Sequence, residues 1–113
     1  MIDYDGKVFV LVSSTSNGDA EEETTFQYHQ HEDLVCGTYS GGSVRFGSFV
    51  AVADEAGILD LRYQHLNVSG ELMTGICRSV PEVLADGRIR LHESWRWTSG
   101  DGSSGESVVE EIE

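Results

Sequence analysis

Basic residues are scarce in this sequence. Lys and Arg together number 7 against 20 Asp and Glu, which gives a formal charge of −13 at pH 7. Nucleic acids and anionic membrane surfaces are bound through a surplus of positive charge, so the composition argues against both kinds of partner. We expect solvated loops or tails, with a specific basic partner as the alternative, for two acidic runs: Asp19, Glu21, Glu22 and Glu23, and Glu106, Glu110, Glu111 and Glu113.

Long hydrophobic runs and cysteines are also few. No apolar segment approaches the roughly 18 residues that span a bilayer. The opening residues 1–5 lack the basic start and the apolar core of a secretory signal. We therefore expect a cytoplasmic protein, in which Cys36 and Cys77 are free, buried thiols. Their separation matches no zinc motif.

Enzyme signatures are missing as well. The sequence has no G-x-S-x-G, no P-loop, no H-E-x-x-H and no C-x-x-C. Gly41-Gly42 and 100–105 are rich in glycine, but no helix is predicted after either, so they indicate turns. His29 and His31 could share a metal ion, although the acidic residues beside them favour a solvated edge. We expect no metal, no cofactor and no catalytic residue.

What the sequence does contain is a pattern of short β-rich segments. Apolar residues nowhere keep helical spacing over three turns, and turn pairs such as Asn17-Gly18 and Asp86-Gly87 separate the segments. The length suits a single domain over residues 1–113. The expected strands are 7–15, 24–30, 34–40, 44–53, 58–67, 72–80, 88–98 and 107–112.

Pairing these segments through tight turns predicts one mostly apolar face that continues across six strands. The opposite face is polar, and no helix is predicted to cover the apolar one. Such a sheet has to fold over or close. We therefore predict an all-β fold: an eight-stranded antiparallel meander closed into a barrel, with room for packed side chains or one small ligand.

The predicted interior carries several polar groups. Its candidate ligand-binding residues are Tyr39, Tyr63, His65, Arg78, Glu93, Trp95 and Trp97. The expected register puts Arg78 and Glu93 on neighbouring strands with Trp95 beside the arginine, which predicts a buried ion pair with a cation–π contact. Such a pair either seals one end of the barrel or binds a small polar or anionic molecule. For His65, a hydrogen-bonded core position is favoured over an acid–base role.

The predicted outer face has one apolar cluster, formed by Phe49, Leu66 and Met73. Apolar residues that gather on an otherwise polar surface indicate an interface. The sequence therefore predicts a homo-oligomer, most simply a homodimer, that associates through this barrel wall.

Four segments carry a family resemblance that extends from about residue 26 to residue 111. They are Gly37-Thr38-Tyr39-Ser40-Gly41-Gly42, Leu61-Arg62-Tyr63-Gln64-His65, Gly70-Glu71-Leu72-Met73-Thr74-Gly75, and Gly87-Arg88-Ile89-Arg90-Leu91-His92-Glu93 with Trp95 and Trp97. The chain resembles short, uncharacterised bacterial proteins with an avidin-like or lipocalin-like barrel, which often carry the label N-acetylglutamate synthase. The resemblance implies the barrel and brings no established catalytic residues.

Three functions remain open at this point. The leading hypothesis is a non-enzymatic barrel that binds a small molecule in its lumen. The second is an enzyme, either an acetyltransferase as the family label implies or a hydrolase that uses His65 and Glu93. The third is an oligomerising structural module with a filled core.

Overall fold

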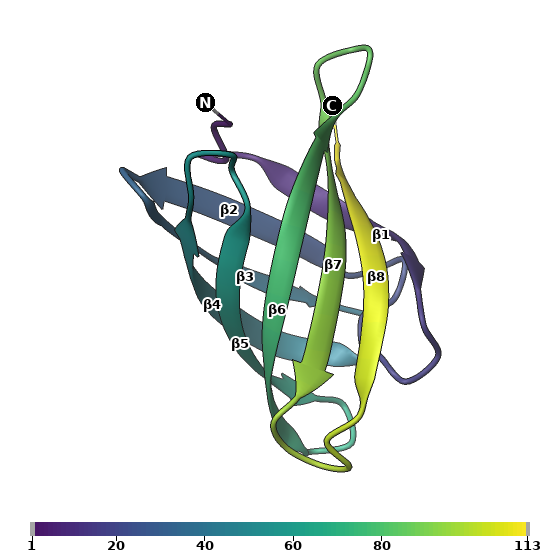
Figure 1. Cartoon of the computed structure of the whole chain (residues 1–113). Helices are drawn as coiled ribbons and strands as arrows, with labels where there is room; N and C mark the ends of the chain where they lie inside the picture. The colour runs from purple at the N-terminus through teal and green to yellow at the C-terminus, as the bar shows by residue number, and fades with distance from the viewer. Residues whose placement is uncertain (1, 113) are drawn as a thin grey trace.

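Eight antiparallel strands follow one another around a closed barrel (Figure 1). The computed structural model describes residues 2–112, and no helix occurs among them. The strands are β1 (Val8–Ser14), β2 (Thr25–His31), β3 (Leu34–Gly41), β4 (Val44–Ala53), β5 (Leu59–Asn67), β6 (Leu72–Val83), β7 (Ile89–Trp97) and β8 (Ser104–Glu111). Pairing between β1 and β8 closes the ring. The predicted all-β meander and its closure into a barrel are confirmed.

Two strand boundaries differ from the sequence prediction by three residues, and the others agree to within one residue. β6 continues through Pro81 as far as Val83, where an end near the proline was expected. Its pairing with β5 stops at Ser79, so beyond that residue it is bonded only to β7, and a missing N–H is tolerated on such an edge. β8 begins at Ser104, inside the segment expected to be a loop.

Three hairpins share one turn that the sequence analysis did not anticipate. Gly57, Gly70 and Gly87 all have positive φ, at 81°, 82° and 91°. Each donates its N–H to the carbonyl three residues earlier, which makes a type I turn followed by a left-handed glycine. In each of these hairpins, five residues separate the last residue pair of the two strands. The register predicted from the sequence assumed an even number of residues in each connection. Each such turn therefore reverses the face that the next strand turns inward.

The inward faces predicted for β4 and β6 were wrong, each for a local reason. A β-bulge at Arg45 adds one residue to β4, so Phe49 points inward and Phe46 outward. The five-residue turn before β6 reverses that strand, which turns Cys77 inward and Arg78 outward, and the turn after β6 restores the predicted face of β7. In β5 and β7 two errors cancel, so the predicted inner faces of those strands are correct.

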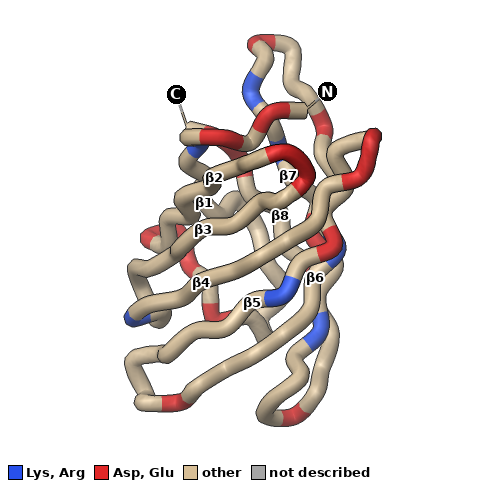
Figure 2. Tube along the Cα trace, turned by 90° about the vertical axis from the view of Figure 1, so that its left-hand side faces the viewer, with Lys and Arg blue, Asp and Glu red and all other residues tan. Residues whose placement is uncertain are grey.

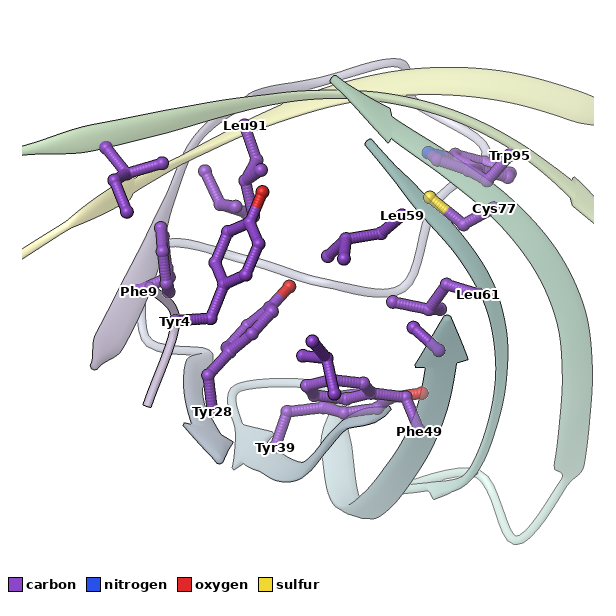
Figure 3. Close-up of a cluster of buried hydrophobic side chains, with 14 of the residues drawn as sticks. Tyr4, Phe9, Tyr28, Tyr39, Phe49, Leu59, Leu61, Cys77, Leu91 and Trp95 are labelled. Atoms are coloured by element: carbon purple, nitrogen blue, oxygen red, sulfur yellow. The ribbon is translucent and has the colours of Figure 1, made fainter. Parts of the chain in front are cut away.

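The interior of the barrel is filled at one end. There the segment before β1 crosses the opening, and Tyr4 packs inside with its hydroxyl donating to the Gly57 carbonyl at 2.5 Å. Figure 3 shows Tyr4, Phe9 and Tyr28 side by side in this cluster. The ring centroids of Phe9 and Tyr28 are 4.7 Å apart. Leu59 and Leu91, both fully buried, complete the packing.

Most charged residues lie on the outer surface. Figure 2 shows acidic residues mostly at strand ends and in connecting loops, as expected for solvated positions. Phe49 and Met73 belong to the interior and its edge, so the predicted interface cluster is wrong in both residues. Leu66 instead pairs with the exposed Phe46 and Leu72 across three strands. The homo-oligomer itself stays a prediction. Glu113 of the second acidic run and Met1 lie outside the described residues.

Candidate functional site: the hollow half of the barrel

The end of the barrel opposite Tyr4 contains a cavity of about 80 Å³. This is roughly half the volume of an engineered cavity that admits benzene, so the space suits a small molecule or a head group. Residues from all eight strands, together with the β1–β2 loop, surround it. Its lining residues are Leu11, Ser14, Gly18, Asp19, Ala20, Phe26, Tyr28, Tyr39, Val44, Phe49, Leu61, Tyr63, His65, Cys77, Glu93, Trp95, Trp97 and Ser107.

Glu93 is the polar centre of this cavity. It projects inward from β7, opposite the fully buried Ser79 of β6. The Ser107 hydroxyl of β8 donates a 2.7 Å hydrogen bond to Glu93 Oε1. Glu93 borders the cavity and is otherwise surrounded by protein atoms. This burial raises the pKa of its carboxyl to about 7, although the hydrogen bond from Ser107 lowers it. Oε2 receives no hydrogen bond from the residues that the structure describes.

Aromatic rings form much of the remaining wall. The indoles of Trp95 and Trp97 pack edge to face with centroids 5.4 Å apart, and Tyr63 packs against Trp97 at 5.7 Å. Phe49 and Tyr28 are 4.6 Å apart on the opposite side. Trp95 and Trp97 are also the two tryptophans of the sequence, so the intrinsic fluorescence of the protein reports on this lumen.

A hydrogen-bonded chain joins the β1–β2 loop to the barrel interior. Asp19 Oδ2 lies 2.8 Å from His65 Nε2, and His65 Nδ1 lies 2.8 Å from the Tyr39 hydroxyl. A carboxylate only accepts, so Nε2 carries the proton; in the neutral ring Nδ1 then accepts from Tyr39. Asn67 also donates to Asp19. The expected core role of His65 agrees with this geometry, because both ring nitrogens have partners.

The β1–β2 loop covers the hollow half. Besides the contact through Asp19, the Asn17 carbonyl accepts a 3.0 Å hydrogen bond from Trp97 Nε1, and Gly18 lies against the Trp95 ring. Gly18, Asp19 and Ala20 all border the cavity. The loop therefore forms the roof of the cavity and shields both tryptophans.

Removing the Asp19 carboxylate should loosen this roof. Asp19→Ala deletes the acceptor for His65 and Asn67, and we expect a loss of about 1.5 kcal/mol in the free energy of unfolding. We also expect faster acrylamide quenching of Trp95 and Trp97. Glu22→Ala, an exposed position in the same loop, is the control. Equal quenching of the two variants would contradict the assignment of Asp19 as the attachment point.

Six of the seven predicted lumen residues lie around one cavity. Tyr39, Tyr63, His65, Glu93, Trp95 and Trp97 all line it. Arg78 does not, because the inverted β6 places its side chain on the outer surface beside Arg62 and Arg96. The predicted Arg78–Glu93 ion pair is therefore wrong, as is the predicted cation–π contact of Arg78 inside the barrel.

Sequence reasoning missed three residues that build the site. Asp19 was assigned to a solvated acidic run, and no local pattern shows that its loop folds back over the barrel. Ser107 lies on β8, whose register the turns did not determine. Cys77 faces inward because β6 is inverted, and burial raises the pKa of its thiol. The chain has no disulfide; Cys77 is buried as expected, while Cys36 is only partly buried on the outer face.

The comparison with protein families decides what kind of barrel this is. The model of the avidin-like protein family matches residues 2–112. The chain belongs to the avidin-like family. No curated protein and no solved structure shows a significant match to it. The match supports the avidin-like part of the resemblance found in the sequence and gives no support to the N-acetylglutamate synthase label.

The cavity of this avidin-like barrel offers no activated nucleophile among the described residues. Burial raises the pKa values of the Tyr39 and Tyr63 hydroxyls and of the Cys77 thiol, so none of them is an activated nucleophile. His65 already uses both ring nitrogens. Within residues 2–112 no cluster of three or more His, Cys, Asp or Glu side chains is placed to hold a metal ion. His29 and His31 both lie exposed on the outer surface.

Proposed function

We propose that this avidin-like barrel is a binding protein that holds a small polar molecule in its hollow half. The observation that supports the proposal best is the division of the interior. One end is packed by Tyr4, Phe9 and their neighbours, while the other retains about 80 Å³ beneath a hydrogen-bonded loop. A barrel that served only as a structural module would gain stability by filling that space. Avidin-like barrels often bind small molecules.

The lining favours a particular polarity. With Arg78 on the outside, neither Lys nor Arg lines the cavity among the described residues, so the reason for expecting an anionic ligand is removed. Apolar and aromatic walls with a few convergent polar groups remain, which is the usual composition of a small-molecule site. Glu93 Oε2 supplies an acceptor for a ligand that donates hydrogen bonds.

The enzymatic alternatives have less support. A hydrolase would need His65 and Glu93 to act together, but no hydrogen bond joins them, and His65 is held by Tyr39 and Asp19. An acetyltransferase would need a site for the cofactor's pyrophosphate, and the cavity lining contains no cationic Lys or Arg for that purpose in the described part of the chain. Binding without chemistry therefore remains the proposal.

Native mass spectrometry of protein purified from its own host tests the proposal. We expect the wild type to carry an additional small mass that disappears on denaturation. Arg78→Gln should retain that mass because Arg78 lies outside the barrel, and Glu93→Leu should lose it because the acceptor is gone. Wild-type protein with no bound molecule, and with unchanged tryptophan fluorescence after unfolding, extraction and refolding, would contradict it.

A further inference from the structure

The charged side chains that line the lumen are all acidic, and one of them has few hydrogen-bond partners. Two carboxylates, Asp19 and Glu93, border the cavity, and no Lys or Arg does so within residues 2–112. Asp19 is held by His65 and Asn67, whereas Glu93 has Ser107 as its hydrogen-bond partner. A buried carboxylate that lacks a counter-charge is costly to ionise. None of the described residues therefore offsets the charge of the Glu93 carboxylate with a positive group.

The aromatic walls suit a bound positive charge. The faces of tryptophan and tyrosine rings attract cations, and sites that enclose ammonium groups combine several such rings. Here Trp95, Trp97 and Tyr63 form one connected edge-to-face group. Glu93 and Trp95 are two residues apart on β7, so they project from the same face of the strand into the same cavity.

From this combination we propose that the hollow half recognises a small organic cation, such as an alkylated ammonium group, bound between the aromatic rings and the Glu93 carboxylate. The inference rests on the proposed small-molecule binding and specifies the ligand class. The cavity of about 80 Å³ limits the enclosed part to a compact head group. Any larger remainder of the ligand has to pass the β1–β2 loop.

The groups around Glu93 predict how binding depends on pH. Four titratable side chains interact electrostatically with Glu93: Tyr28, Tyr39, Tyr63 and Cys77. Burial raises the pKa of each of them. Ser107 is neutral, and Asp19 and His65 are bonded to each other at the loop. Because the pKa of Glu93 is about 7, the carboxylate predominates at pH 8 and the neutral acid at pH 6. Affinity for a cation should therefore increase about tenfold between pH 6 and pH 8.

The test compares two probes of similar size that share three methyl groups on one central atom. Trimethylammonium carries the charge, and tert-butanol, in which a hydroxyl is also attached to the central carbon, is neutral. Each is titrated into the ligand-free protein while the fluorescence of Trp95 and Trp97 is followed at pH 6 and pH 8. Glu93→Gln removes the carboxylate at similar volume. Arg78→Gln removes an exposed charge and is the matched control, and thermal melting verifies that both variants are folded.

We expect saturable binding of trimethylammonium to the wild type and to Arg78→Gln, with affinity at least tenfold lower in Glu93→Gln. Equal binding of tert-butanol, or unchanged binding in Glu93→Gln, would overturn the inference. So would a neutral or anionic molecule recovered from the host-purified protein, although that result would leave the proposed small-molecule binding intact. Absence of any retained molecule and of any probe binding would overturn both.

Discussion

Replacing Phe49 with alanine should lower the free energy of unfolding by about 3–5 kcal/mol, as removal of a buried phenylalanine ring usually does. The side chain is 7% exposed and packs between Tyr28 and Tyr39, with centroid distances of 4.6 and 6.5 Å. Its ring also lies over Gly37, where an added Cβ would approach it within 3 Å. The space left by the ring could not be refilled without a shift of neighbouring strands.

Phe46 provides the matched control, because it is the same residue type on the same strand. It is 59% exposed, on the outer face of the strand next to the bulge at Arg45. We expect Phe46→Ala to change the stability by about 0.5 kcal/mol or less. Urea unfolding followed by circular dichroism measures both variants. The opposite ranking would show that β4 follows the register expected from its sequence and not the one described here.

Glu93 should make the stability of the ligand-free protein depend on pH. Its pKa is raised from an ordinary value near 4.5 to about 7, so the folded state favours the protonated form. The stability gained from Glu93 is therefore fully present below pH 4.5 and is lost as the pH rises through 7. In Glu93→Gln, which cannot ionise, this component is absent.

The quantity to measure is the difference in unfolding free energy between the wild type and Glu93→Gln. Between pH 4.5 and pH 8 the wild type should lose roughly 3 kcal/mol of unfolding free energy relative to Glu93→Gln, since each pKa unit corresponds to about 1.4 kcal/mol. Other titrating groups are common to both proteins and cancel in the difference. A difference that stays constant over this range would mean that the carboxyl is hydrated like a surface glutamate.

The strands could be predicted from the sequence because their signals are local. β-rich segments and turn pairs located all eight strands and indicated a closed barrel. Which side chains of a strand point inward depends on whether the preceding turn contains an odd or an even number of residues. The conformation of the turn sets this number, as the left-handed φ of Gly57 and Gly70 shows. Side chains also build these turns. Asn67, for instance, accepts hydrogen bonds from the Ser69 and Glu71 amides.

The candidate site could likewise be predicted only where the orientation of its strands was predicted correctly. Trp95, Trp97 and Glu93 were placed correctly on the inner face because their strand kept its expected face, and their role in binding stays a prediction. Arg78 was misplaced because one residue of shift reverses every side chain of a strand. The contact of Asp19 with His65 joins residues 46 positions apart through a loop, and no periodicity in the sequence describes it.

The separation of a packed end from a hollow end has a consequence for how such a protein can change. Most of the fully buried apolar side chains, including Tyr4, Phe9, Leu59 and Leu91, do not border the cavity. Substitutions at Trp95 or Tyr63 would therefore alter what the cavity accepts while that packing remains in place. Under the proposed function, selection or a library confined to lining residues other than Phe49 could explore new specificities while the packed end of the barrel stays unchanged.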